Sequence, residues 1–155
     1  MSQTVPLKGI GFWKNEECRR YPQPQWLVRQ GWHTEDLDGI VAYLRSGNQY
    51  LSELGYSYCR FEDCPDKCAD KNGDSTFTDG EWMWPEGLAH YIEKHSVILP
   101  EEFISTMRSN HWRVPAGAGL LPATRWERPV RPRSTRFWLR WARKYGPWYY
   151  RLIFW

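Results

Sequence analysis

The sequence predicts an α+β fold: one small domain over residues 1–114, with a small antiparallel sheet and about three helices, followed by a basic aromatic C-terminal extension. Two observations support this prediction. Residues 82–84 are typical of a short apolar strand that runs into a helix at about residues 86–95, with Pro85 suited to the first helical turn. The chain also contains 11 Trp, 9 Tyr and 6 Phe. Rings of this size bury enough area to build a small core from few side chains.

The N-terminal part of the chain is aromatic but irregular in pattern. Gly and Pro are frequent in residues 1–33, where we expect little regular structure beyond a short strand at residues 26–28. Residues 35–46 are predicted to form a helix, because Thr34 is a suitable N-cap and apolar residues follow at helical spacing. We expect one or two further helical turns through residues 50–54.

The middle of the chain shows the alternation of a sheet. Residues 56–61 alternate as a strand does, and residues 76–78 and 81–84 are its expected partner, with a turn or bulge at residues 79–80. A polar loop separates the two parts at residues 62–75. These segments make up the antiparallel sheet that we predict.

The C-terminal third divides into a helix, a connector and a tail. The helix is expected over about residues 101–110, after a proline that suits its start. Residues 115–134 contain four prolines with Gly and Ala between them, which is typical of an extended linker. Residues 135–155 are the predicted tail, with an amphipathic helix over 135–145 and a strand-like apolar segment over 148–155.

The net charge of +3 conceals a division along the chain. Residues 117–155 contain nine Lys or Arg and one acidic residue, a charge of +8, whereas residues 1–116 carry −5. We predict that the tail binds a partner through its basic and aromatic side chains, namely Arg136, Trp138, Arg140, Trp141, Arg143, Lys144 and Trp148. A protein partner is the first expectation. An anionic membrane surface, nucleic acid, or packing back onto the acidic domain are the alternatives.

The segment Thr78–Tyr91, TDGEWMWPEGLAHY, resembles the signature of a group of small bacterial proteins that have no assigned activity. In that group a Tyr-x-Cys-Arg-Phe-like strand precedes the signature and a Leu-Pro-x-x-Phe element follows it. Tyr58–Phe61 and Leu99–Phe103 match these two elements. The resemblance covers roughly residues 35–105. It implies a small α+β domain and assigns no catalytic residue.

Three of the four cysteines lie close together as Cys59-x4-Cys64-x3-Cys68, a pattern that can hold a zinc ion through thiolates. The candidates for the fourth ligand are Cys18, His90 and His95. The spacers differ from the paired two-residue spacers of many zinc sites. The alternative is therefore a buried thiol at Cys59 and two loop thiols without a special role.

The four histidines otherwise have the pattern of helix-surface or boundary residues. His90 and His95 are five residues apart, about 500° of helical rotation, so we do not expect them to share a helical face. The i, i+4 histidine pair of a zincin is absent. His33 and His111 stand alone in the sequence.

Calcium is the second metal alternative. Residues 70–81 place oxygen-bearing side chains at positions 1, 3, 5 and 12 of an EF-hand-like loop. Ser75 stands where the sharp turn of that loop favours Gly, and the flanking segments do not read as helices. The alternative is a polar hairpin loop, because Asp, Asn and Gly are also common in turns.

No pattern in the sequence predicts a reaction. A nucleophile elbow, a phosphate-binding glycine loop and a dinucleotide fingerprint are absent, and no run of about 18 apolar residues predicts a membrane span. The N-terminal sequence lacks a secretory signal and the cysteines fit a reducing compartment, so we expect a cytoplasmic protein. We predict a non-enzymatic binding or accessory protein. The alternatives are a zinc-dependent module or enzyme built on the Cys59–Cys68 loop, and a nucleic-acid-binding protein.

Overall fold

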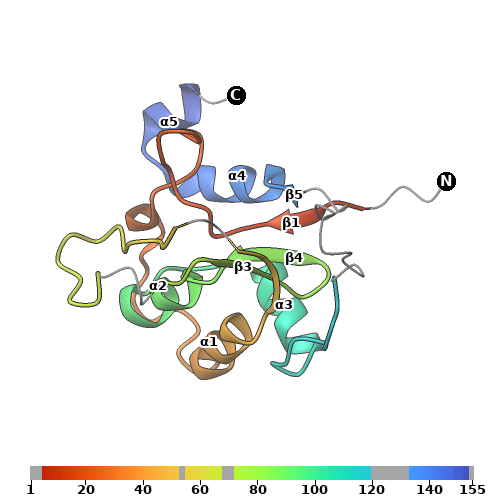
Figure 1. Cartoon of the computed structure of the whole chain (residues 1–155). Coiled ribbons are helices and arrows are strands. Elements are labelled where there is room, and N and C mark those ends of the chain that lie inside the picture. Colours follow the sequence, from red (N-terminus) through yellow and green to blue (C-terminus); the bar gives the residue numbers. More distant parts are fainter. Residues whose placement is uncertain (1–4, 53–54, 68–71, 120–132, 154–155) are drawn as a thin grey trace.

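The computed structural model describes residues 5–52, 55–67, 72–119 and 133–153, which form a mixed α+β structure around one five-stranded sheet (Figure 1). The strands are β1 (Leu7–Gly9), β2 (Asn48–Ser52), β3 (Ser75–Thr78), β4 (Trp82–Pro85) and β5 (Arg133–Ser134). Their order in the sheet is β2-β3-β4-β1-β5. The α+β class of the prediction is confirmed.

The sheet is mixed rather than antiparallel, which corrects the prediction. Strands β2, β3 and β4 are antiparallel, with Phe77 of β3 opposite Trp84 of β4. Strand β1 pairs with β4 in parallel, with Lys8 opposite Trp82, and β5 pairs with β1 in parallel. Both of these additional strands lie where we expected irregular structure or a linker. Strands of two or three residues are too short to show a readable alternation.

The helices are η1 (Pro24–Leu27), α1 (Leu37–Arg45), α2 (Leu88–His95), α3 (Glu101–Ser109), α4 (Arg136–Ala142), η3 (Arg143–Tyr145) and α5 (Trp148–Ile153). Helices α1, α2 and α3 confirm the three predicted for the domain, and α4 with η3 corresponds to the helix predicted in the tail. Figure 1 shows α1, α2 and α3 together on one side and α4 alongside β1. Within the described ranges, no helix has the length and apolar character needed to span a membrane.

Two segments in the middle of the chain differ from the prediction. Residues 48–52 form the edge strand β2, although helical turns were expected at residues 50–54. Residues 56–61 form no strand, and β2 occupies the position beside β3 that we expected them to fill. The alternation in residues 56–61 has another cause, since Cys59 and Phe61 both contact His95 at the end of α2.

The β3–β4 hairpin turns at a buried carboxylate. Asp79 Oδ1 accepts hydrogen bonds from the backbone N–H groups of Glu81 (2.9 Å) and Trp82 (2.7 Å), and Oδ2 accepts one from the Tyr43 hydroxyl (2.8 Å). Burial raises the pKa of the Asp79 carboxyl, and these three hydrogen bonds oppose that rise. The turn is thereby tied to α1, which carries Tyr43.

The two indoles of β4 lie in the core, as the sequence suggested. Trp82 and Trp84 are both fully buried. The Trp82 Nε1–H donates to Thr106 Oγ1 of α3 (3.0 Å), and the Trp84 Nε1–H donates to the carbonyl of Leu44 in α1 (2.9 Å). Each ring therefore contributes apolar area while its polar edge keeps a partner, which joins α1 and α3 to the sheet.

The first part of the C-terminal segment belongs to the same core, although we predicted a separate tail. Trp138 is fully buried, its Nε1–H donates to the carbonyl of Phe12 (2.9 Å), and its ring meets Trp13 edge-on. Trp141 stacks on Trp138 with ring centroids 5.4 Å apart. Of the predicted linker, residues 120–132 lie outside the described part of the chain.

Residues 148–153 form the helix α5, although we predicted a strand-like segment over residues 148–155, of which residues 154–155 lie outside the described part of the chain. In α5, Trp148 and Leu152 are largely exposed while Tyr150, midway between them, is buried against Trp26. In a strand these three alternate positions would face the same way, whereas in a helix the middle one faces away from the other two. A short apolar run does not distinguish these two possibilities by periodicity.

Replacing Trp138 with alanine is expected to destabilise the whole protein, because the ring is completely enclosed. The expected loss in the free energy of unfolding is about 3–5 kcal/mol. Trp148→Ala is the matched control: that side chain is 73 % exposed, so its removal should change stability by no more than about 0.5 kcal/mol. Urea denaturation measures both. Equal, small effects would show that α4 is not part of the core.

Candidate metal centre

Two cysteines and two histidines converge at one point beside α2. One ligand atom from each of Cys59, Cys64, His90 and His95 lies within 4.8 Å of the others. The Cys59 Sγ is 3.3 Å from His95 Nε2, and the Cys64 Sγ is 3.5 Å from His90 Nε2. The first three side chains are buried and His95 is half-buried. This is the only such group among the described residues.

Different local structures position the two pairs of side chains. The cysteines stand on either side of a turn in which the Cys64 N–H donates to the carbonyl of Phe61 (3.2 Å). Both histidines project from α2, which ends at His95 because Ser96 takes a left-handed backbone conformation with φ of 53°. The irregular loop and the rigid helix are thus joined at the four side chains.

The separations suit tetrahedral coordination. With Zn–S near 2.3 Å and Zn–N near 2.0–2.1 Å, a tetrahedral zinc ion separates a sulfur from a nitrogen ligand by about 3.6 Å. The two sulfur–nitrogen distances, 3.3 and 3.5 Å, are close to that value. A set of two thiolates and two imidazoles is a common composition for a structural zinc site. The residue types therefore fit zinc, and two of the six separations between ligand atoms are close to those of a tetrahedral site, with all six within 4.8 Å.

Neighbouring groups support ligands on both the cysteine and the histidine side of the cluster. The Tyr91 hydroxyl accepts a hydrogen bond from the Arg60 N–H (3.0 Å) and lies beside the Cys59 sulfur. The Phe61 ring stacks on the His95 imidazole, with centroids 4.0 Å apart and planes 4° from parallel. Such contacts fix the direction of a ligand before the metal binds.

The pKa shifts in the cluster favour the neutral form of both histidines, which is the form that coordinates a metal ion. Burial lowers the pKa of His90, and the acidic side chains of Asp66 and Glu93 oppose that shift. Burial, with His90 nearby, lowers the pKa of His95. Burial raises the pKa of the Cys59 thiol, whereas the Phe61 N–H and the Tyr91 hydroxyl act in the opposite direction. A bound cation would reverse the effect of burial on the thiol.

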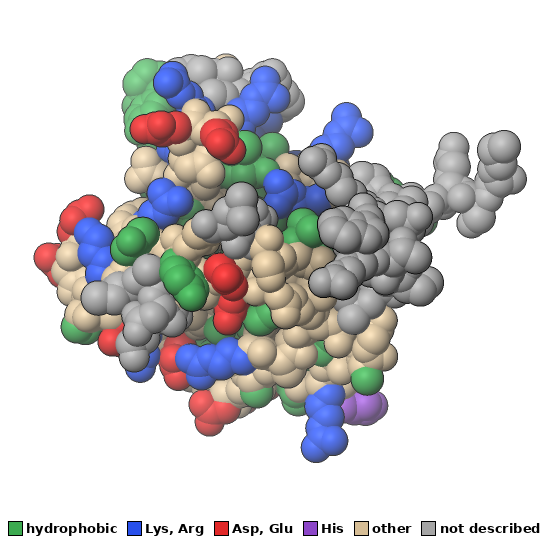
Figure 2. Space-filling view, viewed as in Figure 1, with side chains coloured by type: hydrophobic (Ala, Val, Ile, Leu, Met, Phe, Trp, Pro, Cys, Tyr) green, Lys and Arg blue, Asp and Glu red, His purple; other side chains and the backbone are tan. Residues whose placement is uncertain are grey.

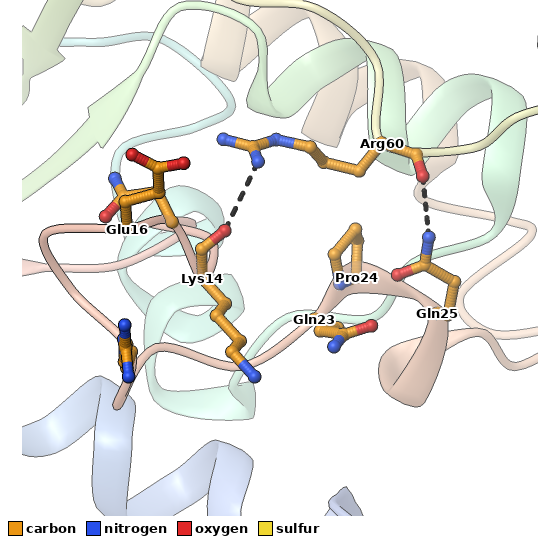
Figure 3. Close-up of a pocket in the computed structure, with 8 residues that line it drawn as sticks. Lys14, Glu16, Gln23, Pro24, Gln25 and Arg60 are labelled. Carbon is orange, nitrogen blue, oxygen red and sulfur yellow. Dashed lines mark hydrogen bonds between the residues drawn. The ribbon is translucent and has the colours of Figure 1, made fainter.

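A second feature lies on the other side of Arg60, where the surface is hollowed (Figure 3). The Arg60 guanidinium donates to the carbonyl of Lys14 (3.2 Å), and the Gln25 amide donates to the carbonyl of Arg60 (2.7 Å). The lining residues are Lys14, Asn15, Glu16, Arg19, Gln23, Pro24, Gln25 and Arg60. This lining is basic and contains no cysteine or histidine. Its contacts hold the backbone that follows Cys59.

The sequence prediction of the metal site is partly right. Cys59 and Cys64 are brought together as predicted, while Cys68 lies outside the described residues. Cys18, one candidate for the fourth ligand, is not in the cluster. His90 and His95 both are, so the expectation that they are ordinary surface or boundary residues is corrected. Their side chains are long enough to meet in front of the helix despite the angle between them.

The structure does not support the calcium alternative, because the described part of the EF-hand-like segment folds as a hairpin. Residues 75–78 of that segment are strand β3, and Phe77 pairs with Trp84 across the hairpin. Glu81, which would close a calcium loop, forms an ion pair with Lys8 instead (2.8 Å). Asp70 lies outside the described residues. The described part of this segment does not have the geometry of an EF-hand loop.

The residues predicted to bind a partner are divided by the fold. Trp138 is in the core, so it is not available to a partner. Trp141 and Arg143 are half-buried, and the exposed members of the set are Arg136, Arg140, Lys144 and Trp148. The apolar face of α4 is therefore not available for binding, and the exposed residues that remain are distributed over α4, η3 and α5.

No family model, curated protein or solved structure matches the chain. The resemblance to the small bacterial proteins thus remains a prediction from the sequence motifs. The features of the molecule that bear on its function are the geometry of the metal centre and the exposed C-terminal surface.

Proposed function

We propose that this protein is a non-enzymatic binding module whose fold is completed by one structural zinc ion. The observation that supports the proposal is the convergence of Cys59, Cys64, His90 and His95, with all four ligand atoms within 4.8 Å of one another. The proposed role of the zinc ion is to fasten the irregular segment around residues 56–67 to helix α2.

The composition of the site favours a structural rather than a catalytic ion. Catalytic zinc sites keep one coordination position for water or substrate, whereas structural sites use four protein ligands. Four protein ligands converge here, and three of them are buried. A zinc ion held by all four would have no open position for a substrate.

The local structure also explains why a metal is useful at this point. Few backbone hydrogen bonds hold residues 56–67; those at Ser57 and Cys64 are examples, made to Gly73 and Phe61. Side-chain contacts such as that of Gln25 with the Arg60 carbonyl add to them. A cross-link of the Cys59–Cys64 turn to α2 would hold a segment that lacks the ladder of a sheet.

Metal analysis of the purified protein tests the proposal. We expect one zinc ion per chain and, after exchange for cobalt, the intense visible absorption of a tetrahedral Co²⁺ site with thiolate ligands. Cys59→Ser and His90→Gln should each lose most of the bound metal, because each removes one of the four ligands. Zinc well below one equivalent in the wild type, after purification without chelator, would refute the proposal.

Matched variants separate the four ligands from the other cysteines and histidines. Cys18→Ser and His111→Gln change the same residue types outside the cluster and should keep one equivalent of zinc. Cys68→Ser decides between the Cys2His2 set and the three-cysteine set that the sequence suggested. We expect the Cys68→Ser variant to retain its full zinc content. Loss of zinc in this variant would show that Cys68 is a ligand in place of one of the histidines.

A further inference from the structure

The exposed end of the C-terminal segment has a distinct chemistry. Trp148 is 73 % exposed, Tyr149 49 % and Leu152 67 %. These three side chains, all on α5, are a large share of the big hydrophobic side chains that the described residues expose. We call them, together with Lys144 and Arg151, the α5 surface. Figure 2 shows hydrophobic and basic side chains at the end of the molecule that carries α5, with acidic side chains beside them.

The exposure of these side chains follows from how α5 is anchored. Tyr150 is buried, meets Trp26 edge-on at 4.7 Å, and donates a hydrogen bond to the carbonyl of Arg20. Arg151 donates to the carbonyl of Lys144 (2.6 Å). Because Tyr150 faces the body of the protein, helical geometry turns Trp148 and Leu152 outward. The exposure of this surface is thus a consequence of how Tyr150 packs against the body of the protein.

The C-terminal segment that carries this surface has charged side chains of one sign, although acidic side chains of another segment lie at the same end of the molecule (Figure 2). Residues 136–153 contain five Lys or Arg and no Asp or Glu. Lys144, Arg140 and Arg151 are exposed. Basic side chains attract anionic lipid headgroups, while Trp and Tyr favour the boundary between headgroups and acyl chains. Exposed Leu and Trp beside such charges are the combination found in segments that lie in the membrane interface.

The shape of the surface favours a lipid bilayer over nucleic acid or a protein as its partner. Sites for single-stranded nucleic acid combine stacking rings with a groove that follows the backbone. Hollows elsewhere in the described part of the chain, such as the one at Arg60, are not lined by Trp148, Tyr149 or Leu152. A stable protein interface needs about 800 Å² from each partner, more than three side chains supply. A flat anionic bilayer can be reached by a projecting helix end.

We propose that the α5 surface docks the protein onto anionic lipid bilayers. Trp148 and Leu152 enter the interfacial layer, Tyr149 lies at headgroup depth, and Lys144 and Arg151 contact the headgroups. This inference names the partner of the proposed binding role, and it does not depend on the zinc ion. The protein lies on the membrane surface, held by charge and by a few apolar side chains together.

Co-sedimentation of the full-length, zinc-loaded protein with lipid vesicles tests the inference. We expect binding to vesicles that contain phosphatidylglycerol and little binding to pure phosphatidylcholine, with affinity that falls as salt is added. The double variant Trp148→Ala/Leu152→Ala should bind at least about tenfold more weakly, because it removes the inserted apolar groups. Lys144→Gln/Arg151→Gln should reduce the preference for phosphatidylglycerol.

The matched control is Tyr56→Ala/Tyr58→Ala, which removes two rings that are each 61 % exposed but lie elsewhere. It should bind vesicles as the wild type does. Absence of vesicle binding, or binding that the Trp148→Ala/Leu152→Ala variant retains in full, would overturn the inference. So would a salt-dependent shift of single-stranded RNA without vesicle binding, which would assign the surface to nucleic acid.

Measuring zinc in the same samples keeps the two proposals separate. Full zinc content with no vesicle binding counts against the α5 surface alone. Vesicle binding by a protein that retains no zinc counts against the metal centre alone. The two sites lie on different elements, since the metal ligands belong to α2 and the loop before β3.

Discussion

Removal of zinc by a strong chelator is expected to lower the melting temperature by about 10 °C or more, the largest effect that we predict on stability. Zinc binding contributes about 10–16 kcal/mol of apparent free energy in zinc-finger peptides, which is comparable with the stability of a whole domain. The effect should be smaller here than in a zinc finger, because this chain has a separate aromatic core. The effect should still be large, since few backbone hydrogen bonds hold residues 56–67 to the rest of the protein.

The loss of structure should be local. Trp82, Trp84 and Phe103 pack together in the core, and none of them is in the metal cluster. Amide hydrogen exchange should therefore become fast around residues 57–64 after chelation and change little in β4 and α3. Cys59→Ser should melt near the temperature of the metal-free wild type, and chelator should have no further effect on it.

Two controls make this prediction specific. Cys18→Ser and His111→Gln should melt like the zinc-loaded wild type and should respond to chelator as it does. An unchanged melting temperature for the wild type with and without chelator would contradict the prediction. In that case the hydrogen bonds of Arg60 with Tyr91 and Gln25 would suffice to hold the loop.

The sequence predicted the centre of the fold better than its edges. The helices α1, α2 and α3 and the β3–β4 hairpin were predicted because apolar periodicity or a turn residue marks each of them, although α1 begins at Leu37 after Asp36 and not at the cap expected at Thr34. The short parallel strands β1 and β5 were not, since their strand character comes from pairing with β4 and with each other. Trp138 was assigned to a binding tail because a buried aromatic stripe and a binding stripe have the same spacing.

The metal centre could have been predicted more fully from the spacing itself. Cys59-x4-Cys64 and His90-x4-His95 fall within the C-x2–4-C and H-x3–5-H spacings of zinc sites. The prediction grouped Cys64 with Cys68 as zinc ligands, because the β3–β4 hairpin separates the cysteine pair from the histidine pair in the chain. The helical angle between the histidines predicted incorrectly that they would not act together. This angle describes the direction of each Cβ atom, whereas the imidazole ring extends well beyond Cβ.

The zinc affinity should depend steeply on pH, and its slope is the second prediction with a large effect. Metal ligands bind as thiolate and neutral imidazole, so zinc displaces any proton that the free ligands carry. Burial lowers the pKa of both His90 and His95, so these rings are neutral at pH 7 and release no proton. Burial raises the pKa of the Cys59 thiol, and free cysteines are mostly protonated at this pH.

Zinc binding should therefore release the proton of the Cys59 thiol at pH 7, so the association constant should fall at least about tenfold per pH unit as pH decreases. Below the lowered pKa values of the histidines, the slope should become steeper. Competition with a chromophoric chelator over a series of pH values measures it. A slope near four at pH 7 would mean that the imidazoles are charged in the free protein, against the direction that burial gives.

Tyr91→Phe probes the same equilibrium from the side of the thiol. The Tyr91 hydroxyl lies beside the Cys59 sulfur and opposes the rise in its pKa. Its removal should raise that pKa further and weaken zinc binding at pH 7 by about 10–100-fold, the usual cost of a lost outer-shell partner. The deficit should shrink as pH rises, because protons then compete less. A deficit that is the same at every pH would instead assign Tyr91 to packing or to its bond with the Arg60 N–H.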